Sequence, residues 1–265
     1  RLRGGEFQFN VGTAGSITLV LQALLPAMIH SRERGRVRVI GGTDIRAAPP
    51  FEYFQHVLLP LLRRMGARVQ SELRRRGYYP RGGGEAWVTV DPGTLRAIQL
   101  DCAGKPQSFS GRAHVANLPA HVVERMRKAA TEPLRKFGIP ETAITAEVLG
   151  KDQAYGQGGA IVLWAETECS VLGAGRVAQR GVRAELLGTE AGTELATDLS
   201  AGVSLDIHAS DQLLVYLALA GGGSHITART LSSHAETTIW LIEQFLPIRF
   251  ETAVGATVSI ATQSK

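Results

Sequence analysis

Apolar residues recur every three or four positions in some stretches of this chain and alternate with polar residues in others. The first pattern predicts helices, because side chains three or four positions apart lie on the same face of a helix. The second predicts half-buried strands, because successive side chains of a strand point to opposite faces of the sheet. The predicted strands of the first ninety residues are 6–11, 37–40, 68–73 and 85–90, and the predicted helices are 17–30 and 51–65. Ser16 is placed to cap the first helix, and Pro49 and Pro50 to open the second.

The middle of the chain has a different order of elements. Strands are predicted at 109–115, 144–149 and 160–168, and helices at 120–137 and 176–199. A helix at 210–220, a strand at 224–229, a helix after Ser233 and a strand at 248–250 then restore the earlier alternation. This change of order predicts a compact α+β block inserted into a larger domain.

Three helical segments share a short motif. Each is apolar on one face, contains a glutamine, reaches Leu-Pro and is followed by a short strand; they are 20–26, 54–60 and 242–247. The motif indicates repeated helix-on-sheet units. The expected fold class is α/β (α+β), with a large domain at 1–107 and 201–265 whose first repeat unit is incomplete. A smaller α+β domain is inserted at 108–200.

The composition is that of a folded chain with a sizeable core. Hydrophobic residues are 44% and charged residues 20%, which excludes a disordered chain, a collagen and a coiled coil. No apolar run reaches the ~18 residues of a membrane-spanning helix, so no membrane partner is expected. Cys102 and Cys169 are too few for a disulfide framework and suit a reducing compartment, so we expect a cytoplasmic location.

The net charge is +5, and the basic residues are 24 arginines and only 5 lysines. The planar arginine fork suits phosphates, but codon usage and a solvated surface explain the same count. Seven arginines fall between Arg63 and Arg81, beside Tyr78, Tyr79 and a triple glycine. This segment fits phosphate contacts with base stacking, and equally a solvated hairpin.

Two clusters contain candidate catalytic groups. His234 stands at the start of a predicted helix, where a neutral imidazole near an anion can attack phosphorus, although a helix-capping histidine is the simpler interpretation. In the run 208–212, Asp211 suits Mg²⁺ or the orientation of a histidine, and Gln212 suits a base or ribose. Ser210 or Asp211 serves equally well as a helix cap.

Taken together, these segments resemble the RNA 3'-terminal phosphate cyclases. The matching stretches follow in the family's order from the first residues to about residue 250. They are Gly4-Gly5-Glu6-Phe7, Gly12-Thr13-Ala14-Gly15-Ser16, Leu19-Val20-Leu21-Gln22, Gly41-Gly42-Thr43-Asp44, Ala48-Pro49-Pro50, Arg76-Gly77-Tyr78-Tyr79-Pro80, Gly82-Gly83-Gly84, Ser210-Asp211-Gln212-Leu213, and His234 followed by Glu243-Gln244-Phe245-Leu246-Pro247-Ile248-Arg249-Phe250. The inserted block also lies where this family carries its small domain.

The resemblance implies an ATP-dependent ligase-type reaction that needs Mg²⁺ or Mn²⁺. The family's nucleophilic histidine falls on His234, which would form a covalent histidyl-AMP. The adenylate would pass to an RNA 3'-phosphate, and the neighbouring 2'-hydroxyl would close a 2',3'-cyclic phosphate. Covalent catalysis of this kind replaces one hard step by easier ones.

The resemblance also assigns binding residues. The ATP site would be lined by Gln22, Pro49, His208, Ala209, Ser210, Asp211 and Gln212. Asp211 would lie near the metal, Pro49 would pack on the adenine, and Arg76 and Arg81 would contact RNA. Position 208 carries His in place of the Tyr of bacterial members, and Cys169-Ser170 stands where some members place an aromatic residue near the adenine.

The family's glycine-rich acidic beginning has no match here, so the chain is expected to be truncated at its N-terminus.

Two alternative functions remain beside the cyclase activity. A non-catalytic relative that acts in ribosome assembly would lack the histidine, which is present at position 234. An enolpyruvyl-transferase-like enzyme also repeats helix-on-sheet units, but the scarcity of lysine and the single insertion disfavour it.

Overall fold

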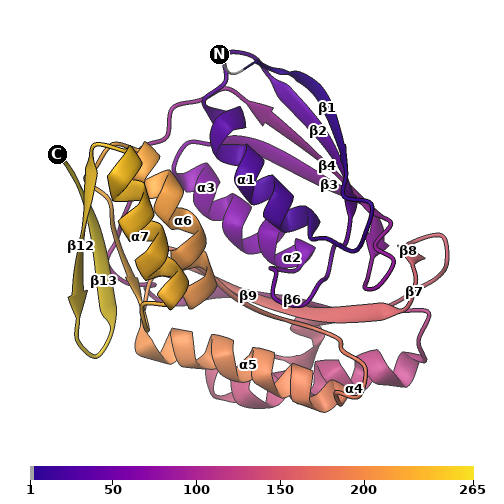
Figure 1. Cartoon of the computed structure of the whole chain (residues 1–265). Helices are drawn as coiled ribbons and strands as arrows, with labels where there is room; N and C mark the ends of the chain where they lie inside the picture. Colours follow the sequence, from indigo (N-terminus) through magenta and orange to yellow (C-terminus); the bar gives the residue numbers. More distant parts are fainter. Residues whose placement is uncertain (1–2) are drawn as a thin grey trace.

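The computed structural model describes residues 3–265 and has a mixed α+β fold with three sheets (Figure 1). The first unit contains β1 (Gly5–Asn10), α1 (Ile17–Ile29), β2 (Gly35–Gly41), a helical run of α2 (Phe51–Tyr53), η1 (Phe54–Leu58) and α3 (Leu59–Arg64), β3 (Arg68–Gly77) and β4 (Gly84–Asp91). The strands lie in the order β1-β2-β4-β3, of which the first pair is parallel and the others antiparallel.

A second unit repeats this topology. It consists of β5 (Gln99–Leu100), α6 (Ile207–Leu219), β11 (His225–Ala228), α7 (Ser233–Phe245), β12 (Ile248–Val254) and β13 (Val258–Ser264). The order β5-β11-β13-β12 again has one parallel pair followed by two antiparallel pairs. The repeat is therefore βαβαββ, and the helix-and-strand motif of the sequence covers two of its six elements. Within residues 3–265 both units have all six elements, where the sequence predicted an incomplete first unit.

The inserted block separates β5 from α6. It contains β6 (Pro106–Ala116), α4 (Ala120–Thr131), η2 (Glu132–Phe137), η3 (Glu141–Ala143), β7 (Ile144–Leu149), β8 (Ala154–Tyr155), β9 (Gly158–Thr167), β10 (Val171–Val177) and α5 (Ala184–Ala201). Its sheet has the order β10-β9-β6-β7 and shares an apolar core with α4 and α5. The short strand β8 instead pairs with β3 of the first unit.

The helix predicted from Arg176 is wrong at its start, because Arg176 belongs to β10 and α5 begins at Ala184. The strand forms because Val171–Val177 pairs along its whole length with β9. Its glycines also permit close packing: a Cβ at Gly173 would lie 2.4 Å from Val57. This contact lets the insert dock against the helical run of the first unit.

The larger core lies between the helices and the sheets of both units. On α1, Ile17, Leu21 and Leu25 are fully buried at a spacing of four residues, as the sequence pattern predicts. Ser16 caps this helix, since its side chain accepts a hydrogen bond from the N–H of Leu19. The predicted helix 51–65 forms, but with one π turn just before Pro60, which has no N–H to continue a regular ladder.

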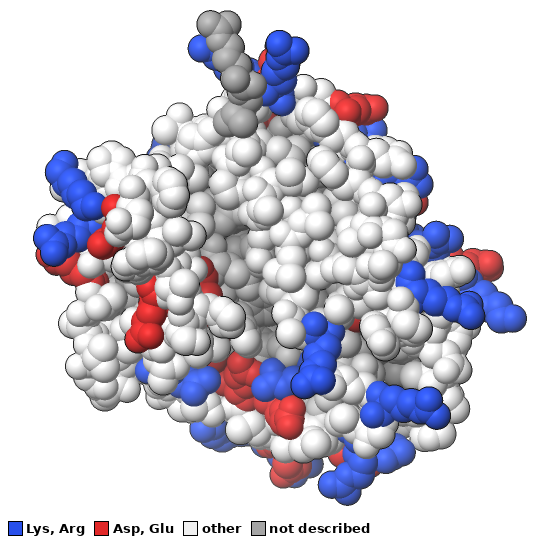
Figure 2. All heavy atoms as spheres, in the orientation of Figure 1, with Lys and Arg blue, Asp and Glu red and all other residues white. Residues whose placement is uncertain are grey.

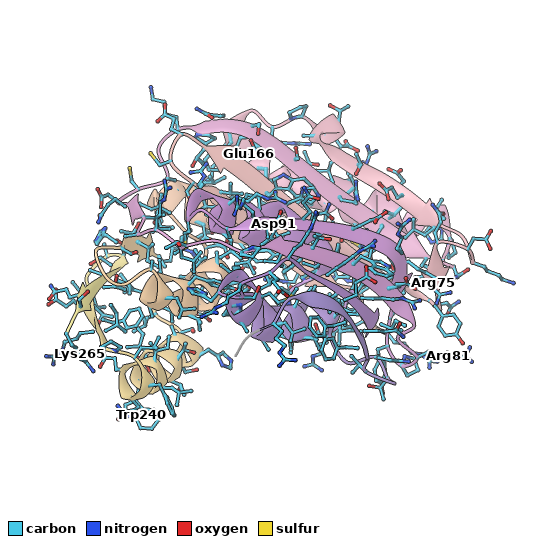
Figure 3. All side chains as sticks on the ribbon, turned by 90° about the horizontal axis from the view of Figure 1, so that it is seen from above. Arg75, Arg81, Asp91, Glu166, Trp240 and Lys265 are labelled. Carbon is cyan, nitrogen blue, oxygen red and sulfur yellow. The ribbon has the colours of Figure 1, made fainter. Side chains whose placement is uncertain are left out.

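The helices α1, α6 and α7 share the front of the molecule in Figure 1. Figure 2 shows that this face is mainly uncharged and carries a shallow hollow between the α7 side and the α1 side. Trp240 of α7 is 63% exposed, and Figure 3 shows it on the same side. Across the described part of the chain, no helix combines the length and apolarity needed to cross a bilayer.

Candidate active site

The helix α6 begins earlier than predicted, and its cap is Asp206. One carboxylate oxygen of Asp206 accepts hydrogen bonds from the N–H groups of His208 (3.0 Å) and Ala209 (2.9 Å). The predicted caps Ser210 and Asp211 lie inside the helix instead. The sequence offered a signal for this cap, since aspartate before an apolar helical run is a favoured N-cap.

Asp206 also connects α6 to two other elements through hydrogen bonds. The carboxylate is fully buried and accepts a hydrogen bond from the hydroxyl of Tyr53 on α2 at 2.6 Å. It accepts another from the N–H of Gly173 on β10 at 2.9 Å. Burial raises the pKa of Asp206, and these hydrogen bonds oppose that rise. One side chain thus sets the position of the predicted nucleotide-binding run relative to both domains.

The run 208–212 divides into two sets of side chains. His208, Asp211 and Gln212 lie at positions i, i+3 and i+4, so they share one face of α6. Ala209 is fully buried, and Ser210 is buried with its hydroxyl donating to the carbonyl oxygen of Ile207 at 2.8 Å. A ligand bound on this face would therefore contact His208, Asp211 and Gln212.

His234 lies at the second position of α7 and is exposed. The helix is capped by Ser232, whose oxygen accepts from the N–H of Ala235 at 2.9 Å. The same hydroxyl donates to both carboxylate oxygens of Asp211, at 2.8 and 2.7 Å. The start of α7 is thereby joined to the face of α6 that carries His208, Asp211 and Gln212. Burial raises the pKa of Asp211, while the Ser232 hydrogen bond and the nearby His208 and His234 oppose the rise.

A second contact joins α1 to α6. The side-chain amide of Gln22 donates to the Gln212 side chain at 2.5 Å. Near the start of α1, the buried Thr18 hydroxyl donates to the carbonyl oxygen of Pro49 at 2.7 Å. Gln22, Gln212, Asp211 and the His234 helix therefore form a continuous series of contacts across α1, α6 and α7, and Pro49 lies at the beginning of α1.

A hollow of about 570 Å³ opens on the His208 side of α6. Its lining comes from α5, β10, the start of α6 and the segment before α7; the residues are Arg176, Thr189, Glu190, Thr193, Glu194, Thr197, Ile207, His208 and Arg229. The Nε2 atom of His208 lies 3.3 Å from Glu194, and this contact raises the pKa of the imidazole. The other predicted ATP-site residues lie outside this lining, so His208 is the link between the hollow and the series of contacts.

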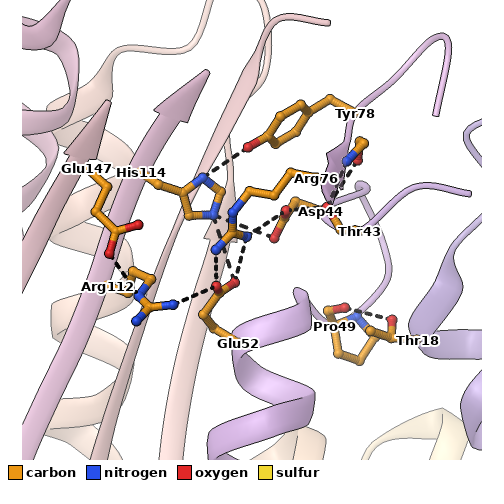
Figure 4. A network of polar contacts seen from close by, with 11 residues as sticks. Thr18, Thr43, Asp44, Pro49, Glu52, Arg76, Tyr78, Arg112, His114 and Glu147 are labelled. Carbon is orange, nitrogen blue, oxygen red and sulfur yellow. Dashed lines mark hydrogen bonds and ion pairs between the residues drawn. The ribbon is translucent and has the colours of Figure 1, made fainter. Parts of the chain in front are cut away.

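Arg76 is buried in a charged network between the two domains (Figure 4). Its guanidinium donates to Glu52 and, at 3.2 Å, to Asp44. His114 of β6 lies 3.8 Å from both carboxylates and contacts the Tyr78 hydroxyl at 3.1 Å. Burial favours the neutral acids, but Arg76 outweighs it and holds the pKa values of Asp44 and Glu52 below their usual range.

This burial corrects the prediction of an RNA contact at Arg76. The cause is a β-bulge in β3, where Leu73 pairs with Ala86 but the next register partner, Glu85, faces Arg75. The extra residue keeps Arg75 at the surface and turns Arg76 inward. Arg81, the other predicted contact, is exposed in the β3–β4 hairpin.

Comparisons with known proteins agree with the resemblance. A family model described as RNA 3'-terminal phosphate cyclase matches residues 1–252. A protein named RNA 3'-terminal phosphate cyclase from Nitrosospira multiformis is 53% identical over 251 residues, which cover 94% of this chain and 70% of the relative. Other proteins of the same name are 42% identical, including one from Pyrobaculum neutrophilum and one from Staphylothermus marinus. The first aligns over 252 residues (94% and 72% of the two chains), and the second over 260 residues (96% and 73%). The chain therefore belongs to the RNA 3'-terminal phosphate cyclase family.

Proposed function

We propose that this chain uses ATP to convert an RNA 3'-terminal phosphate into a 2',3'-cyclic phosphate. The observation that carries the proposal is the exposed imidazole of His234 at the start of α7, beside the face of α6 that carries Asp211 and Gln212. The names of the relatives support the same reaction. A non-catalytic relative would have no use for a nucleophile at this position.

The proposed reaction has three steps: adenylation of the histidine, transfer of the adenylate to RNA, and cyclisation. A ring nitrogen of His234 attacks the α-phosphorus of ATP; an N–P bond forms and pyrophosphate leaves with the electrons of the broken P–O bond. An oxygen of the RNA 3'-phosphate then attacks the same phosphorus, and the histidine leaves. Finally the 2'-hydroxyl attacks the terminal phosphate, loses its proton and expels AMP. Adenylation supplies the leaving group that a phosphate monoester lacks.

The chain's own residues hold the reacting groups in place. The first N–H groups of α7 have no partner within the helix, and together with the helix dipole they favour a phosphate beside His234. The contact between Asp211 and Ser232 fixes the start of α7 against α6. Gln22 and Gln212 restrain each other and offer amide groups to the base or ribose.

Asp211 is the residue proposed to hold a divalent cation. A bound Mg²⁺ or Mn²⁺ would neutralise charge on the transferring phosphoryl group. A carboxylate suits such a hard cation, and that of Asp211 is partly exposed. Among the described residues the one cluster of three metal-type ligands is Asp44, Glu52 and His114. That cluster is closed by the Arg76 guanidinium, so Asp211 would share its cation with the phosphates of the nucleotide.

The test is covalent labelling with ATP that carries ³²P in the α-phosphate, in the presence of Mg²⁺. We expect an acid-labile, hydroxylamine-sensitive label on the protein, and its loss in His234→Ala. His121→Ala is the matched control, because His121 is also an exposed histidine near a helix start. A label that persists in His234→Ala would remove the proposed nucleophile. Absence of label in the unaltered protein would favour the non-catalytic, ribosome-assembly alternative.

A further inference from the structure

The tip of the β3–β4 hairpin carries a group of exposed arginines and tyrosines. Tyr79 and Arg81 lie in the turn, and Tyr79 is 79% exposed. Arg75 precedes the turn on β3, and Tyr155 comes from β8 of the insert, which pairs with β3. We call these four residues the hairpin patch. Figure 3 shows Arg75 and Arg81 at the same edge of the molecule.

Contacts within the hairpin patch hold part of it in a fixed arrangement. The Arg75 guanidinium lies 5.7 Å from the centre of the Tyr155 ring, and its Nε donates to the carbonyl oxygen of Gly83 at 3.0 Å. The Tyr155 ring packs on Gly83, where a Cβ would lie 2.7 Å from the ring. Residues from the two domains thus form one surface, rather than a single freely moving loop.

The charges of the hairpin patch are open to a ligand. Within residues 3–265 neither Arg75 nor Arg81 forms an ion pair with a carboxylate. The neighbouring Arg74, in contrast, pairs with Glu72 at 2.9 Å. Unpaired guanidinium groups beside a free aromatic ring fit a polyanion that also presents flat apolar faces. Single-stranded nucleic acid has this chemistry, whereas a duplex keeps its bases stacked inside.

The hairpin patch is also physically connected to the proposed active site. Gly82 packs against the backbone of the loop before α1: a Cβ there would lie 2.3 Å from the carbonyl oxygen of Thr13. That loop leads directly into α1, which carries Gln22. An RNA strand whose 3' end lies at His234 has its upstream nucleotides free to reach another surface of the same molecule.

We infer that the hairpin patch binds single-stranded RNA upstream of its 3' end, without reading its sequence. Arg75 and Arg81 contact phosphates, and a base stacks on Tyr79. The inference deepens the proposed function and rests on it for the identity of the ligand. It adds a binding surface that is separate from the nucleotide-binding residues.

The test measures RNA binding without ATP. A fluorescent oligopyrimidine RNA of about twelve nucleotides with a 3'-hydroxyl is titrated with the full chain at several salt concentrations. In Arg75→Ala/Arg81→Ala the slope of log K against log salt should shrink by about 1.4, since each phosphate contact on a single strand contributes about 0.7. Tyr79→Ala should weaken binding by at least about fivefold at every salt concentration, and Tyr79→Phe should restore it.

Arg74→Ala is the matched control, because it removes a neighbouring arginine that is already paired. Unchanged affinity and slope in the double arginine variant would overturn the inference, as would unchanged binding in Tyr79→Ala. A loss of equal size in Arg74→Ala would show a diffuse charge effect and would also overturn it. All these variants should label with ATP like the unaltered chain. If the histidyl-AMP proposal is wrong, only the labelling experiment will show it. If the inference about the hairpin patch is wrong, only the RNA titration will show it.

Discussion

Replacing Asp206 by alanine tests whether one buried carboxylate fixes the helix that carries the proposed nucleotide site. Asp206 caps α6 and also accepts hydrogen bonds from Tyr53 and Gly173. The alanine variant leaves both of these donors buried without an acceptor, and it leaves the first N–H groups of α6 uncapped. The variant should therefore be destabilised through three separate contacts.

The magnitude follows from those contacts. Loss of an N-cap costs about 1 kcal/mol. Each buried donor left without a partner costs roughly 1–3 kcal/mol. The sum is on the order of 3–7 kcal/mol, a large fraction of the stability of a typical domain. Asp206→Asn should cost less, because its amide oxygen still accepts from the helix, while its NH₂ group cannot accept from Gly173.

The measurement is equilibrium unfolding in urea, with the exposed Asp152→Ala as the control. With a slope of about 3 kcal/mol per molar urea, the midpoint of Asp206→Ala should fall by roughly 1–2 M. Covalent labelling below the unfolding transition should require more ATP, because α6 has lost its anchor. A loss of less than about 1 kcal/mol would refute the reasoning, and so would equal losses in the alanine and asparagine variants.

Three further predictions concern the network, a titrating group and the hairpin. Arg76→Ala removes the cation that Asp44 and Glu52 share and leaves Glu52 only the longer contact with Arg112 at 3.6 Å, so it should cost about 3–5 kcal/mol in urea unfolding. Arg76→Ala/Glu52→Gln should cost less than the two single changes together, and additivity would show that the pair is not coupled. Burial raises the pKa of Asp198 to about 7, against 3.8 for the free side chain. The folded state therefore keeps this proton to a higher pH than the unfolded state does, so the free energy of unfolding should fall as the pH rises from about 4 to 7. If the free energy of unfolding of Asp198→Asn falls with pH as steeply as that of the unaltered chain, the prediction is wrong. Gly82→Ala should lower the thermal midpoint more than Gly138→Ala, since both glycines have positive φ but only Gly82 meets neighbouring backbone; equal shifts would exclude the close contact.

Local patterns in the sequence were sufficient for most elements. The four-residue spacing of Ile17, Leu21 and Leu25 and the serine at position 16 specify α1, because both signals lie within a few turns of one helix. The start of α7 was predicted on the same grounds, which placed His234 at a helix N-terminus. Strand β10 was missed because its glycines carry no periodic pattern, and its pairing with β9 is what makes it a strand.

The positions of two arginines show where the sequence stops being informative. Arg75 and Arg76 are adjacent and chemically identical, and nothing local says which faces the core. A one-residue bulge against β4 decides it, because side chains alternate along a strand and an extra residue inverts the order. Asp206 is a similar case: the sequence marks it at most as a helix cap, while its partners come from positions 53 and 173.

The sequence by itself thus determined the family, most of the helices and the place of His234 at a helix start, since each depends on contiguous residues. Only the tertiary structure decided which polar groups meet, because hydrogen bonds between segments more than a hundred residues apart, such as Gln22 with Gln212, depend on how the sheets pack.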